Sequence, residues 1–251
     1  MLIFITNRCH MGCVHCMDDC KPEGEDMSFS TFQDAVEFSL TRALPTPLMI
    51  SGGEPTEHPQ FQQFVGYAIQ KIQELPTPIP LLILSNGQWL SEHTGFLKSL
   101  DDLNLPWIGV QVVIDDRYYP THVDEGILSQ YKCVKLCQGV IQIYPIGRAK
   151  DNHLPWQAKA SKCFNVRAAV KQLHPASYQD LTLRYSIAHN KFCSPNIGIN
   201  GELRLGESFL CPACSTIYKS DAEIMYDIAK FKCSGCDFIN EKLDVVYKQF
   251  L

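Results

Sequence analysis

Short apolar runs alternate with amphipathic segments along the first 150 residues of the chain. The apolar runs are continuous, as is typical of strands in a parallel sheet that is covered on both faces; they fall at residues 2–6, 48–50, 81–84 and 107–114. Apolar side chains recur at helical spacing in the segments between them, residues 28–43, 61–75 and 91–103. Strands that alternate with helices in this order predict an α/β fold with a parallel sheet.

Weaker patterns follow in the rest of the chain. They predict helices at 124–131 and 164–173, strands at 132–136, 140–144 and 182–187, and a hairpin at 196–205. The hairpin prediction depends on Asn200-Gly201, because Asn-Gly between alternating apolar residues favours a two-residue turn. The strand–helix rhythm stops near residue 150 and cysteines crowd the C-terminal part, so we expect two domains, residues 1–190 and 191–251.

Composition and charge exclude several classes of protein. A chain of 251 residues with 45% hydrophobic and 20% charged residues has the composition of an ordinary globular protein. Its net charge of −5 gives no general attraction to nucleic acid or to anionic lipid. No apolar run reaches the roughly 18 residues of a membrane span, and the N-terminus has no signal-peptide pattern. We therefore expect a cytoplasmic protein.

Twelve cysteines are many for such a chain, and in a reducing cytoplasm they indicate metal or redox chemistry rather than disulfides. Cys9, Cys13 and Cys16 follow the first predicted strand at x3 and x2 spacing. A cubane iron–sulfur cluster normally takes four thiolates, so three would leave one iron open to a ligand that is not protein. Cysteines outside this spacing are expected to be structural: Cys20 in a loop, and Cys133 and Cys137 in the core.

Unusual turns follow the other predicted strands. Gly52-Gly53-Glu54 comes after the second, Ser85-Asn86-Gly87 after the third and Asp115-Asp116 after the fourth. The carboxyl ends of parallel strands meet at one edge of the sheet, which is where ligands bind in such folds. These turns and the cysteine triplet are therefore expected to form one site.

With these motifs the chain resembles the radical S-adenosylmethionine enzymes. Cys9-x3-Cys13-x2-Cys16 is similar to the cluster loop of that superfamily, and Ser51-Gly52-Gly53-Glu54-Pro55-Thr56 resembles its glycine-glycine-glutamate motif. The segments Ser85-Asn86-Gly87 and Ile143-Tyr144-Pro145-Ile146-Gly147-Arg148 lie where later cofactor and substrate strands would be expected. The resemblance covers roughly residues 1–150.

The resemblance implies a partial (β/α)6 barrel of the TIM type with a small cysteine-rich, metal-binding C-terminal extension. It also implies that Cys9, Cys13 and Cys16 hold a [4Fe-4S] cluster whose open iron chelates the amino and carboxylate groups of S-adenosylmethionine. Reduction cleaves this cofactor to methionine and a 5′-deoxyadenosyl radical, which abstracts hydrogen from a substrate. The cofactor-binding residues expected on this basis are Gly52, Gly53, Glu54, His15, Ser85, Asn86, Asp115 and Arg148.

Elementary chemistry supports several of these roles. The two glycines let the backbone approach a ligand closely, and Glu54 can accept a hydrogen bond from a cationic amino group. The ring of His15, where the family often has Tyr or Phe, can lie against adenine. Asn86 and Asp115 are expected to contact the cofactor amine or ribose, and Arg148 to bind a carboxylate.

A second cysteine group lies near the C-terminus. Cys211-x2-Cys214 and Cys233-x2-Cys236 form two knuckles separated by eighteen residues. The spacing fits a tetrahedral zinc site and, on ligand chemistry, an auxiliary iron–sulfur cluster equally well. The segment from Cys193 to Gly201 resembles the entry of the family's SPASM or twitch extensions, which favours iron. Cys193 or Cys163 could replace one of the four ligands.

Because the C-terminal extension resembles those of peptide-modifying members, the resemblance implies an enzyme that modifies a peptide or peptide-like substrate, with an external electron donor such as flavodoxin or ferredoxin. One alternative is modification of a small metabolite such as a nucleotide, sugar or cofactor precursor, and another is formation of a glycyl radical on a partner enzyme. A non-catalytic iron–sulfur or zinc-knuckle protein is the alternative from a different class. No residue stands out as a catalytic acid or hydrogen donor, and the acidic balance argues against nucleic acid.

Overall fold

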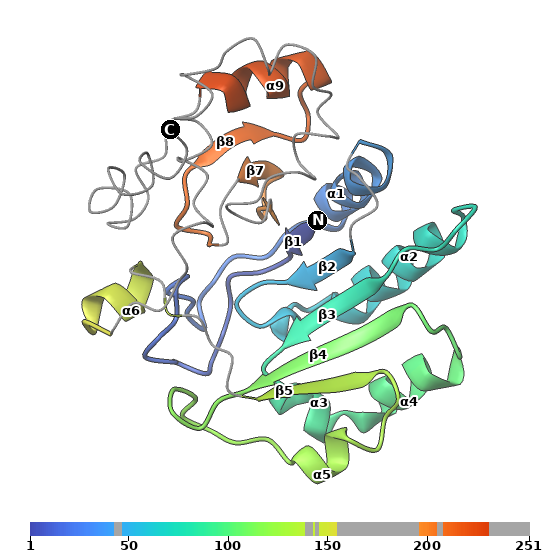
Figure 1. Cartoon of the computed structure of the whole chain (residues 1–251), viewed down its shortest axis with the longest axis vertical. Coiled ribbons are helices and arrows are strands. Elements are labelled where there is room, and N and C mark those ends of the chain that lie inside the picture. The colour runs from blue at the N-terminus through green and yellow to red at the C-terminus, as the bar shows by residue number, and fades with distance from the viewer. Residues whose placement is uncertain (43–46, 139–142, 144–145, 155–195, 205–207, 231–251) are drawn as a thin grey trace, which may run out of the picture.

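A computed structural model describes residues 1–42, 47–138, 143, 146–154, 196–204 and 208–230 (Figure 1). Eight strands from these ranges form one sheet in the order β5-β4-β3-β2-β1-β6-β7-β8. The strands β1 to β6 pair in parallel, whereas β7 and β8 are added antiparallel. Their bounds are Leu2–Phe4 (β1), Leu48–Ser51 (β2), Leu81–Ser85 (β3), Ile108–Ile114 (β4), Val134–Gln138 (β5), Asn196–Ile197 (β6), Glu202–Arg204 (β7) and Ala213–Thr216 (β8).

Helices connect the parallel strands. They are α1 (Phe29–Thr41), the 3-10 helix η1 (Pro55–Glu57), α2 (Phe61–Gln73), α3 (Gln88–Glu92), α4 (Thr94–Asp102), α5 (Glu125–Leu128) and α6 (Gly147–Asp151), whereas α9 (Asp221–Lys230) follows the antiparallel strand β8. Ser28 begins α1 by accepting a hydrogen bond from the Thr31 amide at 3.1 Å, which satisfies one of the free amides of the first turn. The rings of Phe32 and Phe64, both fully buried, stack at 4.3 Å and join α1 to α2.

The strands are buried more deeply on one face than on the other. In β4, for example, Ile108, Val110 and Val112 are buried, whereas the residues between them are half-buried. The apolar face forms the core with the helices. The loop that follows β1 and helix α6 lie at one end of the strands (Figure 1).

The predicted α/β architecture is confirmed, with small shifts in the ends of its elements. The predicted helix at 91–103 is wrong in detail, because the chain forms two helices, α3 and α4, that meet at His93. The His93 backbone is not helical, and its ring stacks on Trp89 at a centroid distance of 4.2 Å. Residues 147–148, expected near the end of a strand, instead begin α6.

The predicted hairpin at 196–205 is present as β6 and β7, and β6 pairs in parallel with β1. The hairpin is thus continuous with the main sheet. The predicted helix at 164–173, the strand at 182–187 and the domain boundary at 190/191 lie outside the described residues, as does the strand at 140–144 except for Ile143. Within the described part of the chain, no helix has the length and apolar character needed to cross a membrane.

Candidate functional site

The loop between β1 and α1 is closed at its base by polar contacts. The Thr6 hydroxyl donates to Asp26 Oδ1 at 2.6 Å, and Arg8 Nε donates to the same carboxylate at 2.9 Å. The Cys9 amide donates to the Lys21 carbonyl at 3.1 Å, so the two ends of the loop run side by side. Residues 9–20 are therefore presented as a closed loop at the end of the sheet.

Cys9, Cys13 and Cys16 line one cavity of about 200 Å³ together with Gly52 and Gly53. Cys9 and Cys13 are buried, and Cys16 is half-buried. Burial raises the pKa of the Cys9 thiol to about 12 and that of the Cys13 thiol to about 11. The structure thus brings the predicted triplet to one cavity, beside the glycines that follow β2.

Cys16 differs from the other two thiols in its surroundings. The thiol of Cys20 is within hydrogen-bonding reach of Cys16, and this contact, with Arg148 close by, lowers the pKa of the Cys16 thiol below its ordinary value. The same contact and burial raise the pKa of Cys20. Cys20 lies in a loop, as predicted, but it is buried and lines the same cavity as the triplet, which its sequence spacing did not indicate.

Gly52 and Gly53 are required by the packing of the backbone. A Cβ on Gly52 would lie 2.3 Å from the Thr6 carbonyl oxygen, and one on Gly53 would lie 2.1 Å from the Arg8 carbonyl oxygen. Their neighbours also bind this segment, since the Gly53 and Glu54 amides donate to the same two carbonyls at 2.8 Å. The glycines therefore let the turn after β2 dock on the cysteine loop, in addition to lining the cavity.

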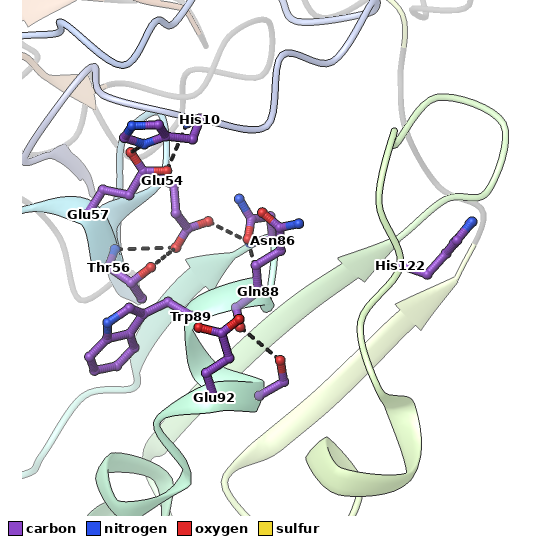
Figure 2. Close-up of a pocket in the computed structure, with 10 residues that line it drawn as sticks. His10, Glu54, Thr56, Glu57, Asn86, Gln88, Trp89, Glu92 and His122 are labelled. Atoms are coloured by element: carbon purple, nitrogen blue, oxygen red, sulfur yellow. Dashed lines mark hydrogen bonds and ion pairs between the residues drawn. The ribbon is translucent and has the colours of Figure 1, made fainter.

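Glu54 is the centre of a buried hydrogen-bond network (Figure 2). Its Oε1 accepts from the Thr56 amide at 3.2 Å, the Thr56 hydroxyl at 2.7 Å and the Ser85 hydroxyl at 2.8 Å. Its Oε2 accepts from the Asn86 amide at 2.7 Å. Burial raises the pKa of Glu54. An ionised carboxylate offers about four acceptor positions, so Oε2 keeps a lone pair for a further donor.

Ser85 and Asn86 join β3 to this network. Ser85 is buried, donates to Glu54 and accepts from the Gly87 amide at 3.0 Å, so its hydroxyl supports the carboxylate. The side-chain Oδ1 of Asn86 accepts from the Gln88 amide at 3.0 Å. Asn86 also lines both the cysteine cavity and the adjoining groove.

His15 belongs to the cysteine loop and packs against the segment that follows β4. Its ring centroid is 5.3 Å from that of Tyr118 and 5.6 Å from that of Tyr119. Its Nδ1 is buried and has no hydrogen-bond partner within the described residues. Burial lowers the pKa of His15, which keeps the imidazole neutral at neutral pH. A neutral ring with an unsatisfied polar atom at a cavity wall suits a ligand that has both an aromatic face and polar edges.

Asp115 is buried and paired. It accepts from Arg117 Nε at 3.0 Å and from Arg117 Nη2 at 2.7 Å, and this pairing lowers the pKa of Asp115. Asp115 and Tyr119 line a small recess that adjoins Asn86. The sequence analysis did not single out Arg117 or Tyr119, although both follow Asp115 directly.

Arg148 reaches the cysteine loop from α6. Its amide donates to the Cys16 carbonyl, and its Nη2 donates to the Cys20 carbonyl, both at 2.9 Å. Asp19 lies 3.5 Å from Arg148 Nε, and the predicted contact of Arg148 with a cofactor carboxylate stays a prediction. The guanidinium therefore faces the loop that carries the thiols.

An open groove of about 310 Å³ adjoins the cavity (Figure 2). His10 forms one wall, and its Nδ1 pairs with Glu57 at 2.6 Å. Glu54 and Asn86 line the groove, Asn86 lines the cavity as well, and Trp89 and Glu92 line the opposite side of the groove. The groove is polar and lies directly beside the Glu54 network.

In the described part of the chain, no three His, Cys, Asp or Glu side chains converge as ligands of a single metal ion. A cubane does not need such convergence, because each thiolate binds a different iron. The loop thiols around one cavity, the adjacent lone pair of Glu54 and the unsatisfied His15 fit a cluster with a nucleoside cofactor. Cys211 and Cys214 lie at β8, whereas Cys163, Cys193, Cys233 and Cys236 fall outside the described residues.

Of the C-terminal cysteine group, the structure describes the first knuckle, Cys211 and Cys214. Cys214 donates its thiol to the Leu203 carbonyl at 3.2 Å, and burial raises the pKa of Cys214 to about 12. Just before this knuckle in the chain, Ser208 donates to the Met17 carbonyl at 3.0 Å, and the Phe209 amide donates to Asp18 Oδ1 at 2.6 Å. Residues 208–209 thus hold the cysteine loop from the other side, a contact that the sequence analysis missed.

Comparison of the sequence finds no matching family model and no match among curated proteins. Comparison of the fold does find relatives. BtrN in complex with AdoMet and 2-DOIA superposes with a TM-score of 0.56 at 14% identity, over 99% of this chain and 85% of BtrN. Native anSMEcpe with bound AdoMet and Cp18Cys peptide superposes with a TM-score of 0.58 at 12% identity, over 100% of this chain and 95% of anSMEcpe. Both structures contain bound AdoMet, and this chain has their fold.

Proposed function

We propose that this chain is a radical S-adenosylmethionine enzyme. The observation that carries the proposal is the cavity at the strand ends, where Cys9, Cys13 and Cys16 meet the Gly52-Gly53 turn beside buried Glu54. A protein that only transferred electrons would have no use for an open cluster site next to a buried carboxylate. The fold shared with two AdoMet-bound enzymes supports the same conclusion.

When bound, the [4Fe-4S] cluster and S-adenosylmethionine supply an electron and a 5′-deoxyadenosyl radical that takes a hydrogen atom from the substrate. The residues of this chain hold and orient these groups. Cys9, Cys13 and Cys16 would bind three irons as thiolates. Because burial favours the protonated thiols of Cys9 and Cys13 in the metal-free protein, cluster binding must displace their protons.

Glu54 is placed to orient the cofactor through its amino group. The free lone pair of Oε2 would accept from the ammonium, while Thr56, Ser85 and the Asn86 amide hold the carboxylate in position. A bound cation would also offset the cost of burying the Glu54 charge. Ser85 therefore acts through Glu54 in this proposal.

His15 would lie against the adenine, with Tyr119 stacked behind its ring at 5.6 Å. Its unsatisfied Nδ1 is available to a polar edge of the cofactor. Asp115, held by Arg117, and the side chain of Asn86 line the recess beside it and would contact the ribose or the amine. An aromatic wall with a few fixed polar groups is the usual composition of a small-molecule site.

We further propose a peptide or peptide-like substrate, with flavodoxin or ferredoxin as the electron donor. The polar groove beside Glu54 is open and is lined by both His10 and Glu92, which suits a polar substrate such as a peptide segment. The neighbour anSMEcpe contains a peptide, which supports the first candidate. A small metabolite is the second candidate, because the neighbour BtrN contains 2-DOIA. Incubation of the reduced enzyme with a cysteine- or serine-containing peptide library and with a metabolite extract, followed by mass spectrometry, would separate the two.

The proposed activity is tested by anaerobic reconstitution with iron and sulfide, followed by dithionite and S-adenosylmethionine. We expect 5′-deoxyadenosine from the wild type and none from Cys13→Ala. The control is Cys133→Ala, whose thiol lies on the Leu97 carbonyl at 3.8 Å and away from the loop; it should retain activity. A full cluster in the wild type without 5′-deoxyadenosine would instead favour a non-catalytic iron–sulfur protein.

A further inference from the structure

We propose that the charge of Arg148 raises the reduction potential of the cluster held by the cysteine loop. The inference rests on the proposed function, and it assigns Arg148 to the cluster rather than to a cofactor carboxylate. Its basis is the attachment of Arg148 to the loop at both its backbone and its guanidinium.

The backbone attachment leaves little freedom. The Arg148 amide donates to the Cys16 carbonyl at 2.9 Å. The residue before it, Gly147, has φ +57°, and a Cβ there would lie 2.7 Å from the carbonyl oxygens of Cys16 and Met17. The start of α6 is therefore packed directly on the backbone of a cluster ligand, which fixes where the Arg148 side chain begins.

The contacts of the guanidinium fix the position of its charge. Nη2 donates to the Cys20 carbonyl at 2.9 Å, and the side chain is only 23% exposed. A Cβ on Gly12 would lie 4.0 Å from Nη1, so the charge also passes close to the backbone between Cys9 and Cys13. Arg148 interacts electrostatically with both Cys13 and Cys16.

A fixed cation beside these thiolates favours the reduced cluster. Reduction adds one negative charge to a group that already carries the charge of its thiolates, and a partly buried cation is weakly screened there. Charge and hydrogen bonding around the sulfurs are among the means by which proteins set the potentials of such clusters. Arg148 would thereby make the cluster easier for a flavodoxin or ferredoxin to reduce.

The test is a redox titration of the reconstituted protein, monitored by EPR without S-adenosylmethionine. At one fixed potential, we expect Arg148→Gln to lower the ratio of reduced to oxidised cluster about tenfold, which is 59 mV for a one-electron couple. Arg148→Lys keeps the charge and should change the ratio less than about threefold. The control is Arg42→Gln, which removes another arginine that binds backbone carbonyls, those of Ile217 and Lys219, far from the loop.

Asp19→Asn tests the same inference independently, in case Arg148→Gln fails to hold the cluster. Asp19 lies 3.5 Å from Arg148 Nε and has φ +50°, a conformation that Asn tolerates well. Asp19→Asn removes a negative charge and should raise the ratio of reduced to oxidised cluster. The expected shift is smaller than for Arg148, because the Asp19 side chain is 36% exposed.

Equal ratios in the wild type, Arg148→Gln and Asp19→Asn would overturn the inference. So would a loss of S-adenosylmethionine affinity in Arg148→Gln with an unchanged potential, because Arg148 would then serve the cofactor carboxylate. Failure of the proposed function has a different signature. In that case, the wild type itself would show no [4Fe-4S] signal, or the signal would not respond to S-adenosylmethionine.

Discussion

Replacing Glu54 with Gln tests the role of the buried carboxylate most directly. The change keeps the shape of the side chain but puts N–H groups where one oxygen now accepts. Either Oε2 no longer accepts from the Asn86 amide, or Oε1 no longer accepts from Thr56 and Ser85. A buried amide without an acceptor costs about 1–3 kcal/mol.

Two effects oppose each other in the free energy of unfolding. The lost acceptor destabilises the fold, while removal of a buried charge stabilises it, since burial raises the pKa of Glu54. The net change in stability therefore does not isolate the role of the carboxylate. Affinity for S-adenosylmethionine has no such compensation. Loss of a charge-assisted hydrogen bond to the ammonium costs about 1.5–3 kcal/mol, which raises Kd about 10- to 150-fold.

The assay is calorimetric titration of S-adenosylmethionine into reconstituted protein with matched iron content. Glu92→Gln is the control, because Glu92 is an exposed residue that lines the neighbouring groove. We expect this control to bind like the wild type. If Glu54→Gln also binds like the wild type, the carboxylate does not hold the amino group and the reasoning is refuted.

Three further changes test other parts of the structure. Gly53→Ala should prevent docking of the turn after β2 on the cysteine loop, because the new Cβ would lie 2.1 Å from the Arg8 carbonyl oxygen. Its control is Gly66→Ala in α2, whose Cβ meets nothing within 4 Å and which should stabilise the fold by about 0.5–1 kcal/mol in urea unfolding. Burial raises the pKa of Asp18 from 3.8 to about 7, so the metal-free protein should lose stability as the pH rises from about 4 to 7. Asp18→Asn should remove the Asp18 share of that loss, at most roughly 4 kcal/mol, in denaturation curves at both pH values. The double change Cys211→Ala/Cys214→Ala should lower iron per chain if the C-terminal centre is an iron–sulfur cluster and zinc per chain if it is a zinc site; unchanged counts of both would exclude these ligands.

The sequence predicted the parallel strands because their apolar runs are continuous and the turns that follow them are distinctive. Parallel pairing then brings those turns to one end of the sheet, so the meeting of the cysteine triplet with Gly52, Gly53 and Glu54 followed from topology. The break at His93 was not predicted, since the apolar spacing of 91–103 reads as one helix. In the structure the backbone of His93 is not helical, and its ring stacks on Trp89.

The supporting contacts of the site could not be predicted, because they join segments that are distant in sequence. Arg148 contacts Cys20 across 128 positions, and Phe209 contacts Asp18 across 191. No local pattern of apolar or polar residues encodes such pairs. The same holds for Gly52 and Gly53, whose close neighbours are the carbonyl oxygens of Thr6 and Arg8.

Residues 208–209 bear on how the protein is made. The ribosome releases the cysteine loop early, but Ser208 and the Phe209 amide, which fasten Met17 and Asp18, emerge nearly two hundred residues later. The loop cannot reach its final form while the nascent chain is short. Iron and sulfide delivered before then would meet a loop that lacks these contacts, so maturation of the cluster is expected to follow the emergence of residues 208–209.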